Sequence, residues 1–209
     1  MSEFKFPTEE IELPSKGLIY SKDNPLSSGK VEIKYMTAKE EDILSNQSFI
    51  QKGNVLEKLL KSVIINKDIN IDDLIVGDKN SLLIATLILG YGKDYEISVK
   101  GTSYVLDMST LENKEFDEKQ FEAGKNEFTF TTPATGTVLT YQLATGKVEK
   151  QIDREVAGLK KLNKEDSSSL TTRLKYLITS VDGSEEKKDI RGFVDNMFLA
   201  RDSRAFRDH

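Results

Sequence analysis

The sequence predicts an α+β fold, mostly helical with short antiparallel strands, arranged as two pseudo-equivalent halves. Several stretches place apolar residues at the 3.6-residue spacing of a helix, most clearly Val55 to Ile64. Shorter stretches alternate apolar and polar side chains as half-buried strands do, for example Val31 to Tyr35. The third observation is a repeat: the stretch from Val55 to Tyr91 has a fainter copy between Ser169 and Phe206.

The two halves are predicted from this repeat. Its residues align at a nearly constant separation of 114 or 115 positions, and similarity at one fixed period indicates that a structural unit occurs twice. We therefore expect an N-terminal half over residues 1–110, a charged connector over 111–127 and a C-terminal half over 128–209. The aligned residues are Leu60-Lys61 with Leu174-Lys175, Gly77 with Gly192, and Ala85 with Ala200.

The N-terminal half is expected to start with strands and to continue into helices. A turn signal at Pro14–Gly17 interrupts the strand region. Thr37 and Glu40 then form a capping box, which predicts the start of a helix. Asn54 should cap the next helix, with Glu57 in the reciprocal position.

The end of this half is predicted to hold its most buried helix and a hairpin. Residues 81–89 are apolar almost all round, and the two glycines that follow should end the helix. Two short strands, Tyr95 to Val99 and Tyr104 to Met108, then flank the turn Lys100-Gly101. The polar connector between the two predicted helices covers residues 67–80.

The C-terminal half repeats the order of strand, helices, polar connector and helix. Pro133–Gly136 resembles the first turn, and Thr145 should cap the helix after the strand. The last two helices are expected at 169–182 and 194–206, with a connector at 183–193. The predicted core residues are Leu59, Leu60, Val63, Leu83, Ile84 and Leu87 in the first half, and Leu174, Leu177, Ile178, Phe193, Met197 and Phe198 in the second.

Composition excludes several classes of function. The net charge of −5 gives no general attraction to nucleic acid or to an anionic membrane. Cysteine is absent, which removes disulfides and thiolate chemistry and favours a reducing compartment. The longest apolar run, Leu82 to Leu89, is far shorter than the ~20 residues that cross a bilayer. Met1 to Glu10 lacks the apolar run of a signal peptide.

We find no constellation that would carry catalysis, and we predict no cofactor and no metal. His209 is the only histidine, so the usual zinc sites and the Ser/His/Asp and Cys/His arrangements are missing. The segments around Gly77 and Gly90 lack the spacing of a phosphate loop and are interpreted as helix caps. The acidic clusters Glu40–Asp42 and Asp72-Asp73 are interpreted as solvated helix faces.

Arginines gather near the C-terminal end of the sequence, between Arg191 and Arg207. Aspartates are interleaved with them, a pattern that favours ion pairing within the chain or with a protein partner over phosphate binding. We therefore expect no nucleic-acid partner for this segment.

Four segments carry a resemblance to a known family: IELPSKGLIY (11–20), KVEIKYMTAKEEDIL (30–44), FTFTTPATGTVLTYQLATG (128–146) and DNMFLARDSRAFRDH (195–209). They resemble the baseplate hub and hub-assembly proteins of T-even-like contractile-tailed bacteriophages. This resemblance implies a non-enzymatic role in building or forming the baseplate, with other tail proteins as partners and no membrane, nucleic acid or small-molecule substrate. It also makes Asp202, Ser203 and Arg204 candidate contact residues, which we group with Arg201 and Arg207 as the predicted partner-binding set.

Within this hypothesis two roles remain open, a permanent virion component or a chaperone that leaves after assembly in the host cytoplasm. Copy number, the partner's identity and any short segment beyond His209 also remain open. The main alternative is a small cytosolic adaptor or regulatory protein that binds a helix or peptide between its helices. A hydrolase or transferase is a third class, for which no residue spacing gives a reason.

Overall fold

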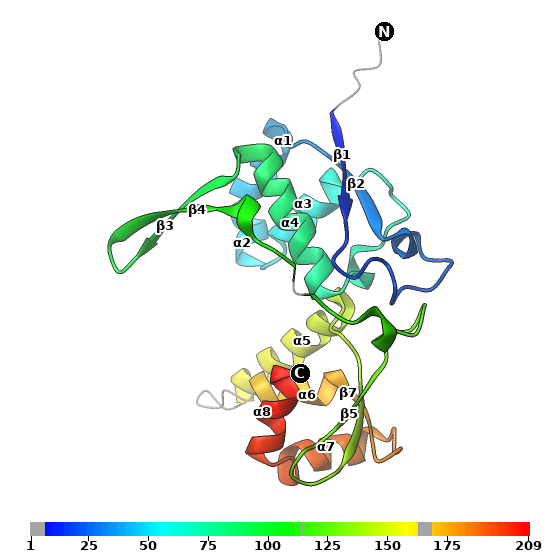
Figure 1. The fold of residues 1–209 in the computed structure, drawn as a ribbon. Coiled ribbons are helices and arrows are strands. Elements are labelled where there is room, and N and C mark those ends of the chain that lie inside the picture. Colours follow the sequence, from blue (N-terminus) through cyan, green and yellow to red (C-terminus); the bar gives the residue numbers. More distant parts are fainter. Residues whose placement is uncertain (1–6, 114, 163–168) are drawn as a thin grey trace. The chain divides into compact units, whose positions relative to one another are not determined.

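The computed structural model describes residues 7–113, 115–162 and 169–209. Helices and short antiparallel strands make up this part of the chain, which confirms the predicted α+β class. The chain forms two compact units, unit 1 (Met1–Lys119) and unit 2 (Gln120–His209), drawn in Figure 1. The division between the units falls inside the predicted connector at 111–127.

Unit 1 begins with a two-stranded antiparallel sheet. Strands β1 (Thr8–Glu12) and β2 (Lys30–Lys34) pair so that Ile11 lies opposite Val31. The loop between the strands contains a 3-10 turn, Pro25–Ser28. After α3 the chain returns to this sheet, where Ile64 forms a single bridge with Ile33.

Three short helices follow, and side-chain caps mark the starts of the first two. They are α1 (Ala38–Ser45), α2 (Gln47–Gln51) and α3 (Val55–Val63). The capping box of Thr37 and Glu40 is present at the start of α1, as predicted. Asn54 occupies the N-cap position of α3, but its side chain makes no capping hydrogen bond, so that part of the expectation is wrong.

Helix α4 (Val76–Tyr91) begins five residues earlier than predicted and ends at Gly92, as expected from the glycines. Its buried residues are Asp78, Leu82 and Thr86, which lie four residues apart on one face. Residues 81–89 are nevertheless buried or half-buried throughout, as expected of a well-covered helix. The predicted core residues Leu83, Ile84 and Leu87 are half-buried, so they border the fully buried core.

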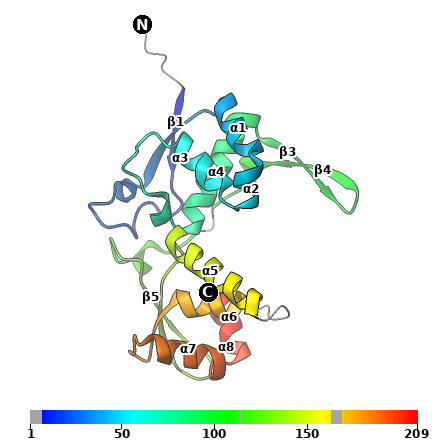
Figure 2. The ribbon, with the colours of Figure 1, turned by 180° about the vertical axis from the view of Figure 1, so that it is seen from behind.

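The predicted hairpin is confirmed. Strands β3 (Asp94–Val99) and β4 (Thr102–Asp107) pair along their whole length. Lys100 and Gly101 form the two-residue turn, both with positive φ, as the tightest hairpin turns require. The hairpin extends away from the helices of unit 1 in both Figure 1 and Figure 2.

Among its described residues, unit 2 contains a three-stranded antiparallel sheet in the order β5-β6-β7 and four helices. The predicted helix at 169–182 stops at Leu177, because the chain enters β7 and pairs with β6. The predicted connector at 183–193 is largely helical, and the predicted helix at 194–206 is divided between α7 and α8. The bounds are β5 (Phe128–Thr131), β6 (Val138–Tyr141), α5 (Gly146–Leu162), α6 (Ser169–Leu177), β7 (Ile178–Val181), α7 (Lys187–Asn196) and α8 (Ala200–Asp208).

The core of unit 2 lies between its sheet and helices α6, α7 and α8. Leu174, Ile178 and Phe193 are buried there, as predicted. Met197 is 65 % exposed, because it lies in the break between α7 and α8, so its predicted core position is wrong. Leu177 and Phe198 are half-buried. The remaining buried residues of this core are Leu139, Ile190, Val194 and Phe206.

The predicted internal duplication is not shown by the structure. Leu60 and Leu174 are both buried in helices that lead into a strand-like segment. However, Gly77 lies in the first turn of α4, whereas Gly192 lies within α7. The aligned positions are therefore not equivalent throughout the two units.

Candidate functional site

A buried carboxylate holds the turn of unit 1 that the sequence marks at Pro14–Gly17, here called the first anchored loop. Asp78, fully buried on α4, accepts hydrogen bonds from the backbone N–H of Ser15 at 2.9 Å and from its Oγ at 2.6 Å. The hydroxyl of Tyr20 donates to the same carboxylate at 2.6 Å. Burial, and then the charge of Asp78, raise the pKa of Tyr20, so the tyrosine stays a neutral donor.

A second carboxylate holds Pro133–Gly136, the second anchored loop, in the same way. Asp202 on α8 accepts from the backbone N–H of Ala134 at 2.8 Å and from Thr135 Oγ1 at 2.9 Å. In both units the aspartate is the third residue of its helix, and the residue after the loop's proline donates its N–H. The two carboxylates therefore stabilise their loops and leave no free oxygen pair for chemistry.

The structure separates the members of the predicted partner-binding set. Asp202 is fully buried, so it is not available at the surface and the expectation of a contact role for it is wrong. Ser203 is half-buried. The three arginines, Arg201, Arg204 and Arg207, are exposed on α8, and their contact role stays a prediction.

Glu40 corrects the interpretation of residues 40–42 as a solvated face. It is fully buried and accepts hydrogen bonds from Lys34 Nζ at 2.7 Å and from Ser62 Oγ at 2.5 Å. The backbone N–H and hydroxyl of Thr37 also donate to it, at 2.9 and 2.7 Å. Burial opposes ionisation, but these hydrogen bonds outweigh it and lower the pKa of Glu40 to about 2.

Two ion pairs engage charged groups of unit 2 in a similar way. Arg191 donates two hydrogen bonds to Glu155, at 2.8 and 2.7 Å, and lowers the pKa of that carboxyl to about 2. Lys175 pairs with Asp195 at 2.6 Å. Lys175 and Arg191 line a depression of about 410 Å³, where they are already engaged by acids of the same unit. Within residues 7–113, 115–162 and 169–209, no three potential ligands gather to hold a metal ion.

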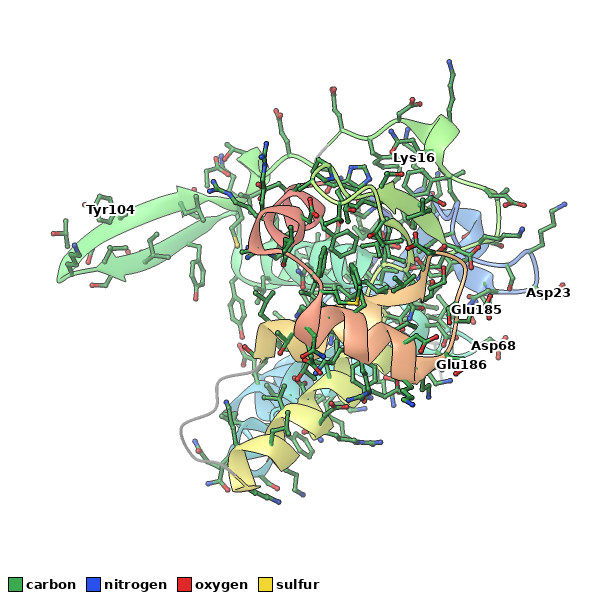
Figure 3. The ribbon with its side chains drawn as sticks, turned by 90° about the horizontal axis from the view of Figure 1, so that it is seen from below. Lys16, Asp23, Asp68, Tyr104, Glu185 and Glu186 are labelled. Carbon is green, nitrogen blue, oxygen red and sulfur yellow. The ribbon has the colours of Figure 1, made fainter. Side chains whose placement is uncertain are left out.

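The β3–β4 hairpin offers the clearest contact surface. Opposed residues of an antiparallel pair share a face, and here one face is apolar and aromatic while the other is polar and acidic. Tyr104 projects from this hairpin in Figure 3. The apolar face contains Tyr95, Ile97, Val99, Thr102, Tyr104 and Leu106, and the polar face contains Asp94, Glu96, Ser98, Ser103, Val105 and Asp107.

This apolar face is open to solvent. Tyr95, Val99 and Tyr104 are 50 to 54 % exposed, and Leu106 is 38 % exposed. A two-stranded sheet is only marginally stable in water by itself, and a contiguous exposed apolar face marks an interaction site. The sequence predicted the hairpin but no role for it, although the alternation of large apolar residues in both strands was a usable signal.

Comparison with protein-family models, with curated proteins and with solved structures finds no match for this chain. Among the described residues, no helix combines the length and apolarity that crossing a bilayer requires. The candidate site therefore rests on its own geometry, which is an exposed apolar face on a two-stranded sheet.

Proposed function

We propose that the chain is a non-enzymatic structural or assembly protein of a bacteriophage tail baseplate, which binds other tail proteins through the apolar face of the β3–β4 hairpin. The observation that carries this proposal is the exposed row of aromatic and aliphatic side chains around Tyr95 and Tyr104. Aromatic residues on an open sheet face provide large contact area at low entropic cost, as protein interfaces require.

The placement of the segments that resemble baseplate proteins supports the same proposal. Segment 11–20 contains Ser15 and Tyr20, which both donate to Asp78. Segment 195–209 contains Asp202, which holds the loop in segment 128–146. The segments that carry the resemblance therefore contain residues that stabilise the loops of the two units. Such residues support the fold, as expected in a protein that functions through its surfaces. Its location would be the host cytoplasm during assembly, or the virion.

A deletion of the gene in the phage that carries it tests the proposal. We expect negative-stain electron microscopy of the lysate to show particles without complete baseplates, and the infectious titre to fall. Normal tails and a normal titre would contradict it. Mass spectrometry of purified wild-type particles then separates the two roles, because a permanent component is present in stoichiometric amount and a chaperone is not.

The adaptor alternative has one observation in its favour. An apolar pocket of about 290 Å³ in unit 2 is lined by Leu170, Leu174, Leu177 and Phe206, and it could accept a side chain of a bound helix. This alternative predicts co-purification with a partner outside the tail and normal particles from the deletion strain.

A further inference from the structure

The outer edge of β4 lacks the features that prevent an edge strand from pairing with a strand of another molecule. Residues 102–106 carry no charge, proline or glycine and are rich in β-formers. Edge strands of this kind pair with another strand unless charge, proline or a bulge prevents it. The other edge of the hairpin is protected, because β3 carries Asp94 and Glu96.

The backbone groups that β4 offers to a further strand can be identified from the ladder. Met108 donates its N–H to the carbonyl of Lys93 at 2.8 Å. Such pairs recur at every second residue of an antiparallel ladder, so Thr102, Tyr104 and Leu106 turn their groups toward β3. Ser103 and Val105 therefore turn theirs outward.

From this edge we infer that β4 pairs with β4 of a second copy of the chain, forming a four-stranded antiparallel sheet about a two-fold axis at Tyr104. Opposed residues must lie on the same face of the sheet. An odd-numbered residue of one copy can therefore pair only with an odd-numbered residue of the other, and an even-numbered residue only with an even-numbered one. The registers centred on Tyr104 and on Val105 overlap equal lengths of β4, and we choose the first because it leaves Asp107 outside the paired residues 102–106, which carry no charge. It places Ser103 opposite Val105 of the second copy.

Charge and space both fit this arrangement. No like charges are opposed along the paired edges, because Asp107, which is paired with Lys93 of its own hairpin, lies outside the paired residues 102–106. Because the two hairpins run in opposite directions, the helices of the two copies lie at opposite ends of the new sheet. Isologous pairing of this kind closes on itself and does not propagate into fibres.

The dimer would also strengthen the hairpin and enlarge its surface. Two strands become four, which is the size at which a sheet with one apolar face gains independent stability. The two-fold axis is perpendicular to the sheet, so the apolar faces of both copies lie on the same side and form one surface. This inference goes beyond the proposed function and does not depend on it, because it concerns the purified chain alone.

The molar mass of the full chain in solution tests the inference with two matched variants. Ser103→Pro removes an outward N–H on β4, whereas Ser98→Pro makes the same change at the opposed residue on the β3 edge. Over a hundredfold range of concentration, sedimentation of the wild type and of Ser98→Pro should rise from the 23.6 kDa chain toward twice that mass. Ser103→Pro should remain at the chain mass.

Three results would overturn the inference: a wild type that stays monomeric over the whole range, equal dimerisation of both proline variants, or loss of dimer in Ser98→Pro.

A covalent test covers the case in which a proline variant fails to fold. Because the chain contains no cysteine, a single introduced thiol reports one contact. Mild oxidation should link Tyr104→Cys to itself across the axis, where Cα atoms approach to ~4.5 Å, and should not link Tyr95→Cys. Equal linking of the two variants would contradict the register.

Either outcome of these tests is separable from the outcome of the gene deletion. If the purified chain is monomeric but the phage needs the gene to build its baseplate, the dimer is contradicted and the proposed function is supported. If the purified chain dimerises but tails form normally without the gene, the dimer is supported and the proposed function is contradicted.

Discussion

Single buried carboxylates determine much of this structure. Asp78, Asp202 and Glu40 are each fully buried and ionisable, and each is surrounded by donors from a loop or from a helix start. Burying a charge costs free energy unless hydrogen bonds compensate for the lost water. These carboxylates therefore stabilise the fold only while their hydrogen-bond donors are present.

Asp78 should be among the most sensitive positions in unit 1. Replacing Asp78 with Asn leaves one amide oxygen for the three donors from Ser15 and Tyr20. We expect the free energy of unfolding to fall by about 2–4 kcal/mol, measured by chemical denaturation. Asp68→Asn on the exposed surface is the control and should change it by less than ~0.5 kcal/mol. Equal effects of the two substitutions would argue against the anchoring role.

Glu40 should make stability depend on acid. Its pKa in the folded chain is about 2, below the ordinary value of 4.5. The resulting stabilisation is complete above pH 4.5 and is lost as pH falls toward 2, with a total on the order of 2–3 kcal/mol. Glu40→Gln should lower stability at pH 7 and flatten this dependence in denaturation experiments from pH 7 to 2.5. Glu41→Gln, on the exposed face of α1, should leave the dependence of the wild type intact.

At the scale of elements, the sequence predicts best where a local rule decides the structure. The capping box at Thr37 and the turn at Lys100-Gly101 depend on neighbouring residues only, and both are confirmed. The division between α7 and α8 and the early end of α6 depend on tertiary packing. In particular, Ile178 is placed in a strand by its pairing with Tyr141, which no local pattern contains.

The candidate site shows the same limit. The sequence located the hairpin and the arginines of α8, but the burial of Asp202 results from its bonds to a loop about seventy residues earlier. Because Asp202 and this loop lie so far apart in the sequence, no local sequence pattern predicts their contact. The exposure of the hairpin face likewise depends on how the other elements of the chain pack, which the sequence of the hairpin alone does not determine.

The two anchored loops should respond differently to the same substitution. Gly17 and Gly136 both have positive φ, where a Cβ costs ~1–2 kcal/mol. A Cβ on Gly17 would in addition lie 2.6 Å from the backbone nitrogen of Gly29, whereas one on Gly136 would meet nothing within 4 Å. Gly17→Ala should therefore destabilise the chain by at least ~1 kcal/mol more than Gly136→Ala in thermal or chemical denaturation. A larger effect at Gly136 would contradict the tight packing of the first loop.

At the scale of the whole molecule, the chain consists of two units that each contain sheet, helices and a carboxylate-held loop. Glu155, Arg191 and Lys175 are engaged within their own unit, and the hairpin presents an open apolar face. This distribution suits a protein that acts by contact, and the hairpin face is the part of it on which the proposed function depends.

Complementation of the gene deletion tests this central claim most directly. The apolar-face variant carries Tyr95→Ser, Tyr104→Ser and Leu106→Ser, and the control carries Glu96→Ser and Val105→Ser on the opposite face of the same hairpin. Both variants should fold, as judged by circular dichroism, because these side chains are exposed. We expect the control to restore complete tails in electron micrographs and the apolar-face variant to fail to do so. Full restoration by the apolar-face variant would show that baseplate assembly does not need this face.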